Sequence, residues 1–411
     1  MHCCSQWGHD FRPDYKFLGA MRAIFSDVPI LGLTATSTAA VTKDVKEILR
    51  IPTAMVFTSG FNRPNLRYSV RSKPENAEEN YDYLAGLVTG EFRGGSGIIY
   101  STTVKEVETL YTELKKRGVK VGPYHAQMEP EARSRVHRKW SSGDIQLIVA
   151  TVAFGMGIDK PDVRYVIHNT ISRSMENFYQ ESGRAGRDGK KASCIMLWRL
   201  ADVFKQSTMV FQERTGTEKL YSMVNYCLST GVCRRKLIAD HFLESMERTV
   251  ACHQMCDVCD GELDLTEVDL LDVTDYCKAA VDILNAGVTK EVRITSAKLV
   301  EALQGKGANN VKIPSWRGGQ LNKEQVEQVV GSMMVEQYLI EDMHYTPYSV
   351  ISYLLPGHRD VENVKIKPFP NLKSKANPKT GKRKSAEQKN ENSKKMKSNS
   401  NVNIVISSDD E

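Results

Sequence analysis

Alternating strand-like and helix-like segments between about residues 59 and 215 constrain the fold of this chain more than any other feature. Short apolar runs typical of buried strands are SGIIYS, VKVGPYH, IQLIVATVAF and VRYVIH. Amphipathic segments such as TVKEVETLYTELKKRG lie between them, and Gly118 marks the end of that helix. Strands that alternate with helices form a parallel sheet covered on both faces, so an α/β fold is expected.

Further segments flank this region. Residues 1–58 continue the alternation, with the apolar run VPILGLTAT as a strand between two helical segments. Residues 216–263 are helical and contain cysteine, and residues 264–356 hold helices and then two strands around a turn at Thr346–Pro347. Residues 357–411 are rich in Lys, Asn, Ser and Pro, which predicts a disordered tail.

The net charge of +6 belongs to this tail. Residues 357–411 hold 13 Lys and Arg against 7 Asp and Glu, whereas the remaining residues hold 43 of each sign. A folded part without net charge needs local basic patches to bind nucleic acid. No apolar run reaches the roughly 18–20 residues of a membrane span. Nine scattered cysteines indicate a reducing compartment, the cytosol or nucleus, rather than a disulfide scaffold.

Four cysteines are spaced as C-x18-C-x3-C-x2-C, namely Cys233, Cys252, Cys256 and Cys259. Four thiolates with two short inner loops suit a tetrahedral, structural zinc ion, whereas a single C-x-x-C is also compatible with redox chemistry. Cys227 and Cys277 fall outside the spacing and are expected in the core. Arg234 and Arg235, beside a ligand, fit either a contact with DNA or a solvated helix surface.

The stretches ATVAFGMGIDKPDVRYVIH and QESGRAGRDG carry the most specific chemistry. Gly155 and Gly157 permit a close backbone approach after a strand, and Asp159 is placed to accept from a hydroxyl or a metal-bound water. Arg184 and Arg187, three apart on one helical face, present planar cations suited to phosphate. An isolated R-x-x-R is also typical of a solvated basic helix start.

These two stretches resemble motifs V and VI of superfamily 2 helicases, in the form found in the RecQ family. GLTATST (32–38) and GIIYSTT (97–103) resemble motifs III and IV, and FNRPN (61–65) resembles the linker into the second lobe. The resemblance implies a remnant of RecA-like lobe one at 1–58, lobe two at 59–215, a zinc-binding subdomain at 216–263 and a winged helix at 264–356. It also implies an ATP-dependent 3′-to-5′ DNA helicase with structural Zn²⁺, which uses ATP and Mg²⁺ when complete.

The resemblance assigns roles to individual residues. Arg187 is implied as an arginine finger with Arg184 beside it, and Thr34 and Thr36 as couplers of nucleotide state to movement. Gln180, Asp159 and Gly157 are implied to line the nucleotide cleft. Three residues are implied to lie near DNA: Arg63, Thr151 and His125. A lone histidine such as His125 is more often a structural residue with a hydrogen-bond partner.

The opening SQWGHDFRPDY (5–15) resembles the aromatic-rich loop that follows motif II, and His2 matches the final residue of that motif's D-E-x-H box. In this interpretation Trp7 and Phe11 stack on the bases of single-stranded DNA, and Arg12 contacts phosphate. The alternative is that Trp7, Phe11 and Tyr15 form one face of a core helix, which Gly8 and Pro13 disfavour.

The predicted hairpin in IEDMHYTPYSVISYL resembles the β-wing that enters a DNA fork. Tyr348 matches the aromatic residue at its tip, and Tyr345 is the second candidate. An aromatic ring there can replace a stacking partner lost at the fork. Tyrosine is also favoured in strands for packing alone.

The tail contains two short signals. KRK (382–384) and KKMK (394–397) resemble a bipartite signal for a nuclear import receptor, so 382–397 predicts a nuclear protein. VNIVISSDDE (402–411) resembles a SUMO-interacting motif, which binds by adding a strand to its partner. Solubilising charge and chance apolar clustering are the respective alternatives.

The 411 residues contain no G-x-x-x-x-G-K-[S/T] loop, and no acidic pair precedes His2. The expectation is an N-terminally truncated form, or an incomplete gene model, of a RecQ helicase similar to the short animal type without an HRDC domain. Such a chain is expected to lack ATPase activity alone. The alternative is a non-catalytic module that binds DNA forks, anneals strands or binds a partner. An RNA helicase is disfavoured by the cysteines and the hairpin.

Overall fold

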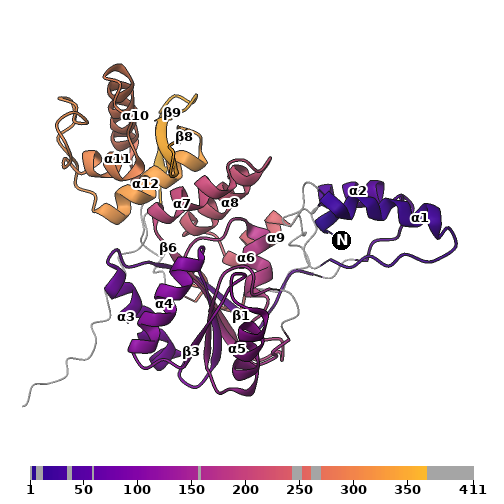
Figure 1. Cartoon of the computed structure of the whole chain (residues 1–411). Coiled ribbons are helices and arrows are strands. Elements are labelled where there is room, and N and C mark those ends of the chain that lie inside the picture. The colour runs from indigo at the N-terminus through magenta and orange to yellow at the C-terminus, as the bar shows by residue number, and fades with distance from the viewer. Residues whose placement is uncertain are drawn as a thin grey trace, which may run out of the picture. The chain divides into compact units, whose positions relative to one another are not determined.

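The computed structural model describes residues 2–5, 13–34, 39–57, 60–155, 159–242, 252–260 and 270–367. Within these ranges lie a parallel sheet with flanking helices, a cysteine-bearing helical segment, and helices followed by an antiparallel hairpin (Figure 1). None of the helices in this part of the chain is long and apolar enough to cross a membrane.

Six parallel strands form the sheet in the order β1-β6-β5-β2-β4-β3, which confirms the fold class expected from the sequence. Their bounds are β1 Leu66–Ser72, β2 Ser96–Tyr100, β3 Val121–Tyr124, β4 Leu147–Ala150, β5 Val163–His168 and β6 Ala192–Trp198. Because every pairing is parallel, the carboxyl ends of all the strands meet at one edge of the sheet, the carboxyl edge.

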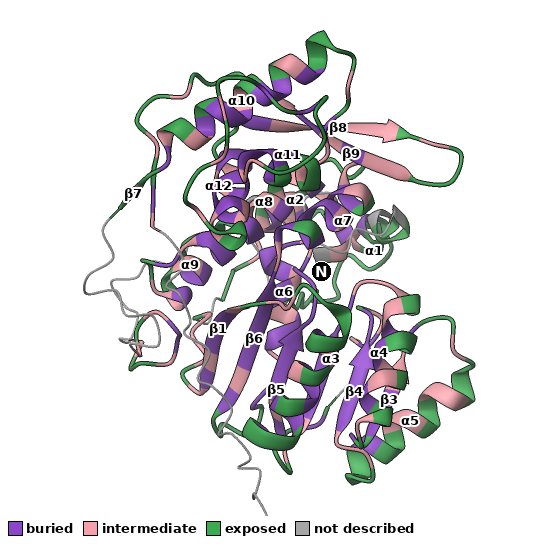
Figure 2. Ribbon diagram, turned by 90° about the vertical axis from the view of Figure 1, so that its left-hand side faces the viewer, coloured by how far each residue is buried: buried purple, intermediate pink, exposed green. Residues whose placement is uncertain are grey.

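Apolar side chains bury both faces of this sheet. Ile98 and Ile99 are neighbours in β2 but belong to two separate clusters, because successive residues of a strand point to opposite faces. The cluster of Ile99 contains Leu84 and Leu110 of α3 and α4, and Figure 2 shows buried strands behind helices with exposed outer faces. The helix bounds are α3 Ala77–Gly86, the π-helical η3 Leu87–Glu91, α4 Val104–Lys116, α5 Pro130–Ser142 and α6 Met175–Ser182.

Local sequence signals set the ends of α4 as expected. The Thr103 side chain accepts a hydrogen bond from the Glu106 amide at 3.2 Å, and the Glu106 carboxylate accepts from the Thr103 amide at 3.3 Å. This reciprocal pair satisfies amide groups that have no partner within the helix. Gly118, with a φ of 79°, ends the helix in the left-handed region that glycine enters without strain.

The N-terminal segment has a small cluster of its own, formed by Cys4, Val41, Val45 and Leu49. Its elements are η1 His2–Cys4, the 3-10 helix η2 Pro13–Ala20, α1 Met21–Ile24 and α2 Ala39–Ile48. The strand predicted for VPILGLTAT is wrong over its described part, residues 28–34, where Leu31 and Leu33 are 83% and 75% exposed. A strand forms only beside a second strand that pairs with its backbone, and residues 28–34 belong to none of the sheets formed by the described residues.

After β6 the chain becomes helical, with α7 Leu200–Val210, α8 Gly216–Leu228 and α9 Arg234–His241. The next part contains the predicted helices and hairpin: α10 Thr274–Thr289, α11 Ser296–Leu303, α12 Lys323–Val335, β8 Leu339–Tyr345 and β9 Val350–Pro356. The strands β8 and β9 pair antiparallel around the expected turn, which Thr346 closes through a 2.8 Å hydrogen bond from its amide to the Ser349 carbonyl.

The predicted start of the tail at residue 357 is too early. β10, Lys365–Ile366, pairs antiparallel with β7, Leu271–Asp272, and Ile366 is buried. Composition could not predict β10, because its neighbours in the sequence are charged. One buried isoleucine and a few backbone hydrogen bonds hold this short strand in place. The import signal at 382–397 and the SUMO-type motif at 402–411 lie outside the described residues.

Candidate functional site

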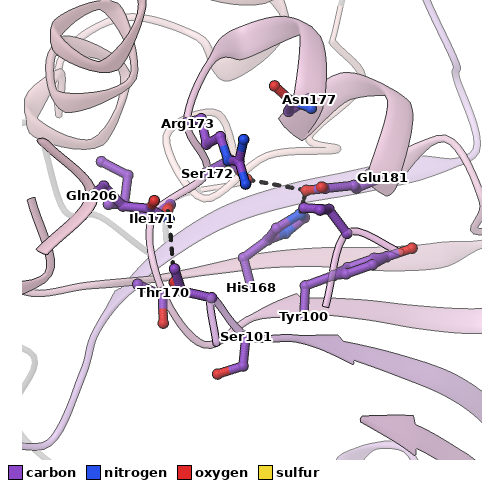
Figure 3. Close-up of a pocket in the computed structure, with 12 residues that line it drawn as sticks. Tyr100, Ser101, His168, Thr170, Ile171, Ser172, Arg173, Asn177, Glu181 and Gln206 are labelled. Atoms are coloured by element: carbon purple, nitrogen blue, oxygen red, sulfur yellow. Dashed lines mark hydrogen bonds and ion pairs between the residues drawn. The ribbon is translucent and has the colours of Figure 1, made fainter. Parts of the chain in front are cut away.

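A polar pocket opens at the carboxyl edge of the sheet, beside the ends of β2 and β5 (Figure 3). We call it the carboxyl-edge pocket; α6 and α7 complete its wall. Its lining residues are Tyr100, Ser101, Thr102, Val152, His168, Thr170, Ile171, Ser172, Arg173, Asn177, Glu181 and Gln206. Most of these carry a hydroxyl, amide or charge. Ligands bind at this edge in open α/β sheets because the loops there converge.

Several buried polar atoms of this pocket have no hydrogen-bond partner among the described residues. They include the Thr170 hydroxyl, the His168 Nδ1 and the Gln206 Oε1. Buried polar groups without partners are rare, and each suggests a water or ligand that completes the site. Arg173 adds a cation that is 41% exposed and lies 4.0 Å from Glu213. The pocket therefore suits an anionic, oxygen-rich group.

A buried hydrogen-bonded pair, His168 and Glu181, lines the pocket. His168 Nε2 lies 2.8 Å from Glu181 Oε2, and both side chains are almost fully buried. The Ser172 hydroxyl donates to the same carboxylate oxygen at 3.2 Å, and Tyr100 stacks on the His168 ring (Figure 3). This contact joins the end of β5 to α6, the helix that precedes the two predicted arginines.

Arg184 is an internal anchor, and the sequence-based placement of Arg184 and Arg187 on one helical face is wrong. The helix α6 ends at Ser182, and Gly186 adopts a φ of 56°, so both arginines lie in turns. Arg184 is 7% exposed and donates from Nη1 to the Gly155 carbonyl at 2.5 Å. Its Nη1 therefore holds a backbone loop, its Nε has no hydrogen-bond partner among the described residues, and the role near the nucleotide expected from the sequence stays a prediction.

The same loop is held a second time by Tyr100, whose hydroxyl donates to the Phe154 carbonyl at 2.8 Å. Burial raises the pKa of this hydroxyl, so it remains a donor. Arg184 and Tyr100 therefore fix the backbone after β4 from two sides.

Arg187 lies at the surface, unlike Arg184. Its Nη1 is 3.2 Å from Asp159 Oδ1, and the side chains are 36% and 90% exposed. The structure thus brings together two residues that the sequence assigned to the nucleotide cleft. Gln180 is half-buried and lies on α6, before the turn that carries Arg187. Gly157 lies outside the described residues.

Arg63 holds the turn that carries these arginines. Its guanidinium donates to the carbonyls of Ala185 and Gly186 at 3.1 Å each and to that of Gly183 at 3.4 Å. Asn65 donates to Gly186 and, from the same amide, to Lys190. This geometry favours a positioning role for Arg63 over the direct DNA contact expected from the sequence.

His125 and Thr151 are both buried beside β3 and β4. The His125 Nε2 lies 2.6 Å from Glu108 Oε1 on α4, so this histidine has a structural partner. Thr151 donates its amide to the Tyr124 carbonyl at 3.2 Å, and its hydroxyl accepts from the Ala153 amide at 3.4 Å. Their predicted proximity to DNA stays a prediction.

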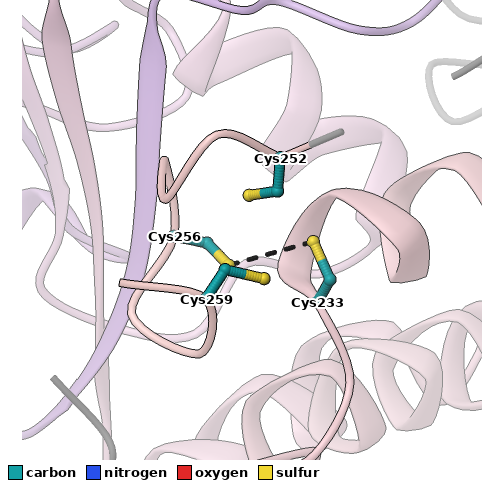
Figure 4. Close-up of side chains that lie close together, drawn as sticks. All are labelled: Cys233, Cys252, Cys256 and Cys259. Atoms are coloured by element: carbon teal, nitrogen blue, oxygen red, sulfur yellow. Dashed lines mark hydrogen bonds between the residues drawn. The ribbon is translucent and has the colours of Figure 1, made fainter. Parts of the chain in front are cut away.

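The four predicted metal ligands converge (Figure 4). The sulfur atoms of Cys233, Cys252, Cys256 and Cys259 all lie within 4.8 Å of one another, and those of Cys233 and Cys256 are 3.9 Å apart. Thiolates 2.3 Å from a tetrahedral zinc ion lie about 3.8 Å apart. The segment around Cys256 also pairs with Tyr68 of β1, which attaches the cluster to the sheet.

The electrostatics of the cluster fit a bound cation. The hydrogen bond between Cys233 and Cys256 lowers the pKa of Cys233 and raises that of Cys256, and burial raises the pKa of Cys259 to about 12. Four thiols this close cannot all ionise unless a positive ion compensates their charge. The loop between Cys252 and Cys256 bends through His253 and Gln254, whose φ values are 49° and 61°. Two consecutive non-glycine residues in this region indicate a strained turn that a closed metal site would hold.

A buried ion pair lies directly behind the cluster. Arg234 follows one ligand and Asp257 follows another, and their side chains are 1% and 2% exposed. Arg234 Nε donates to Asp257 Oδ1 at 2.9 Å and Nη2 to Oδ2 at 3.2 Å. Both sequence-based alternatives for Arg234, DNA contact and a solvated surface, are therefore wrong. Its neighbour Arg235 donates to the carbonyls of Arg63 and Leu66.

The hairpin presents an aromatic ring at its tip. Tyr348 is 98% exposed, and the turn below it is closed by the Thr346 hydroxyl, which accepts from the Ser349 amide at 2.9 Å. Tyr345 is instead held at the side: its hydroxyl accepts from Gln212 at 3.2 Å, and its ring meets Phe211 edge-on. The structure separates these two candidates and leaves Tyr348 available for stacking.

Two segments of the chain match known families. Residues 79–189 match the helicase conserved C-terminal domain, and residues 200–260 match the RecQ zinc-binding domain. ATP-dependent DNA helicase Q1 of Rattus norvegicus is 46% identical over 359 residues, which cover 87% of this chain and 57% of that protein. The putative ATP-dependent DNA helicase Q1 of Caenorhabditis elegans is 48% identical over 366 residues, with 87% and 56% covered. This chain belongs to the RecQ family.

The chain spans little more than half the length of these RecQ relatives. Among solved structures, S. cerevisiae Dbp5 bound to RNA and ADP BeF3 is 25% identical with a TM-score of 0.36, covering 40% of this chain and 44% of that one. The RecQ zinc-binding match includes all four clustered cysteines, which agrees with a structural zinc site.

Some RecQ assignments made from the sequence lie outside the described residues: Trp7, Phe11, Arg12, Thr36 and Gly157. The side chain of His2 is also not described, and Thr34 is exposed. The sequence reasoning missed Thr170, Ser172 and Gln206 in the pocket and Asp257 behind the cysteines. Of these, only Asp257 had a signal, since it directly follows a predicted ligand.

Proposed function

We propose that this chain is the DNA-holding and strand-separating part of an ATP-dependent 3′-to-5′ DNA helicase. The observation that carries the proposal is the carboxyl-edge pocket, where hydroxyl, amide and guanidinium groups converge. Arg173, which is 41% exposed, would contact a phosphate oxygen of a single strand, because a guanidinium suits the phosphodiester group. The same motor would serve DNA repair, recombination and replication.

The hairpin supplies the second part of this function. Tyr348 projects from a closed turn on two paired strands. Its ring would stack on the base pair at the fork and compensate part of the unstacking energy, a few kcal/mol per step. In this role the helices α10 to α12 and the hairpin act as a winged helix.

Nucleotide hydrolysis would need more than this polypeptide. Arg187 at the surface is the candidate for stabilising charge on a transferring phosphoryl group, which requires a nucleotide held by a phosphate-binding loop. The 411 residues contain no such loop sequence. We therefore propose that the chain by itself does not hydrolyse ATP, and that ATP and Mg²⁺ belong to the complete motor.

The second candidate is a non-catalytic module that binds forked or annealing DNA or a protein partner. Both candidates predict that the purified chain shows no DNA-stimulated phosphate release in ATP and Mg²⁺, so this assay tests the absence of ATPase activity that they share. The proposal expects no release above background, and turnover typical of a complete helicase would refute it. A nuclear location, an import receptor at 382–397 and SUMO at 402–411 are further proposals that rest on the sequence alone.

DNA binding by the pocket is tested with Arg173→Ala in titrations of a labelled single strand. The expected result is weaker binding and a salt slope reduced by about 0.7, the share of one phosphate contact. Arg164→Ala is the matched control, because Arg164 lies at the opposite end of β5 and pairs with Asp188. Equal affinities and slopes for both variants would refute the assignment.

A further inference from the structure

One face of the hairpin is joined to the helices α7 and α8 through a half-buried carboxylate. Glu341, on β8, accepts a hydrogen bond from the Ser207 hydroxyl at 2.6 Å and from the Tyr221 hydroxyl at 2.8 Å. Ser352, on the paired strand β9, donates to the same carboxylate. Three hydroxyl groups from three elements thus converge on one side chain.

A second contact lies four residues further along the same face of β8. Tyr345 points to the same side as Glu341, because alternate residues of a strand share a face. Its hydroxyl accepts from Gln212, and its ring lies 5.9 Å from that of Phe211, at the end of α7. Besides the core packing of Leu339 and Leu354, β8 therefore has two side-chain contacts with this side of the helices, and the exposed Tyr348 lies beyond the second.

Two attachment points on a stiff strand fix its direction, whereas one leaves it free to pivot. We propose that Glu341 is a positioning residue that, through Ser207 and Tyr221, holds the hairpin in the direction in which Tyr348 meets the DNA fork. The inference rests on the proposed function, since it concerns the same hairpin. It adds that helices α7 and α8 are the platform on which fork recognition depends.

The choice of a carboxylate fits this role better than an apolar contact. Hydrogen bonds to a charged acceptor are shorter and stronger than neutral ones and restrict direction. An apolar side chain at position 341 would fill the space but would leave Ser207 and Tyr221 without this acceptor and would allow sliding. Asp342, the next residue, belongs to the other face of the strand and has the same charge, which makes it a matched control.

The test is a double-mutant cycle on the affinity of the whole chain for a forked duplex, with a single strand as the reference ligand. Tyr348→Ala is expected to weaken fork binding about tenfold, the range of one lost stacking contact. Glu341→Ala should weaken it by a factor of about five through the same ring. The double variant should then bind like Tyr348→Ala alone, and Asp342→Ala should bind like the unmodified chain.

The outcomes separate the inference from the proposed function. The positioning role of Glu341 would be overturned by additive losses in the double variant, or by a loss from Tyr348→Ala with none from Glu341→Ala. Either result would leave the assignment of the hairpin to the DNA fork unchanged. No loss from Tyr348→Ala would overturn both. Glu341→Gln should recover most of the affinity, because its amide can accept from Tyr221 and donate to Ser207. If Glu341→Ala does not fold, Ser207→Ala combined with Tyr221→Phe removes the same bonds and replaces it in the cycle.

Discussion

Arg234→Met removes one half of the buried ion pair behind the cysteine cluster while keeping a side chain of similar length. The native guanidinium makes two bonds to Asp257, at 2.9 and 3.2 Å, and donates to the Tyr226 carbonyl. In the variant the Asp257 carboxylate keeps only the Val70 amide, at 2.8 Å. Because an unpaired charge remains buried, the free energy of unfolding should fall by about 3–5 kcal/mol.

Zinc affinity should fall in the same variant. Arg234 and Asp257 directly follow Cys233 and Cys256, so the ion pair sets the spacing of two ligands. Loss of groups that orient metal ligands typically weakens binding by roughly 10–100-fold. Urea unfolding with zinc in excess gives the stability, and competition with a chromophoric chelator gives the affinity.

Arg359→Met is the control, because the ion pair of Arg359 with Glu336 is more than half exposed on both sides. Such surface pairs contribute about 0–1 kcal/mol. A loss in Arg234→Met no larger than in this control would refute the reasoning. Adding Asp257→Asn to Arg234→Met removes the stranded charge and should restore part of the stability. A double variant no more stable than Arg234→Met would contradict the assigned cause.

Three further predictions concern single residues. Gly186→Ala should destabilise the chain by more than about 1 kcal/mol in urea unfolding, because φ is 56° and the new Cβ would lie 2.4 Å from the Asn65 amide nitrogen. Arg184→Met should lower the free energy of unfolding by about 1.5–3 kcal/mol, because the hydrogen bond to the Gly155 carbonyl is lost. Arg187→Met should change it by no more than about 0.5 kcal/mol, because Arg187 lies at the surface. Equal losses in the two variants would contradict the anchor role of Arg184. Burial raises the pKa of Glu341, so the native chain loses stability as pH rises from the usual value of 4.5 through the raised pKa. Glu341→Gln does not titrate there and should gain stability relative to the native chain over that rise. A difference that stays constant with pH would contradict the sign.

The periodic parts of the fold could be predicted because burial imposes a period on the sequence. Strands such as β2 and β5 are apolar on both faces, and helix α4 carries its own start and stop signals. The cysteine cluster was equally visible, since metal geometry demands particular residue types at short spacing. The strand predicted for residues 28–34 was wrong, because an apolar run becomes a strand only beside a second strand, and these residues are instead largely exposed.

The arginines show what a linear pattern cannot supply. Arg184 and Arg187 look alike in the sequence, yet one is an internal anchor and the other lies at the surface. The difference arises from the left-handed turn at Gly186 and from Arg63, which lies 123 residues before Gly186 in the chain. Burial of Arg234 likewise depends on Asp257, a partner brought near by the cysteines. Long-range partners decide whether a cation binds a ligand or the protein itself.

The central claim is that the carboxyl-edge pocket holds the backbone of a single DNA strand. Photo-cross-linking of the whole chain to a single strand that carries 5-iodouracil, followed by peptide mapping, tests it most directly. The account predicts cross-links in peptides that contain residues 97–104 and 165–182, which line the pocket. Cross-links confined to other parts of the lobe, with none in these two peptides, would contradict it.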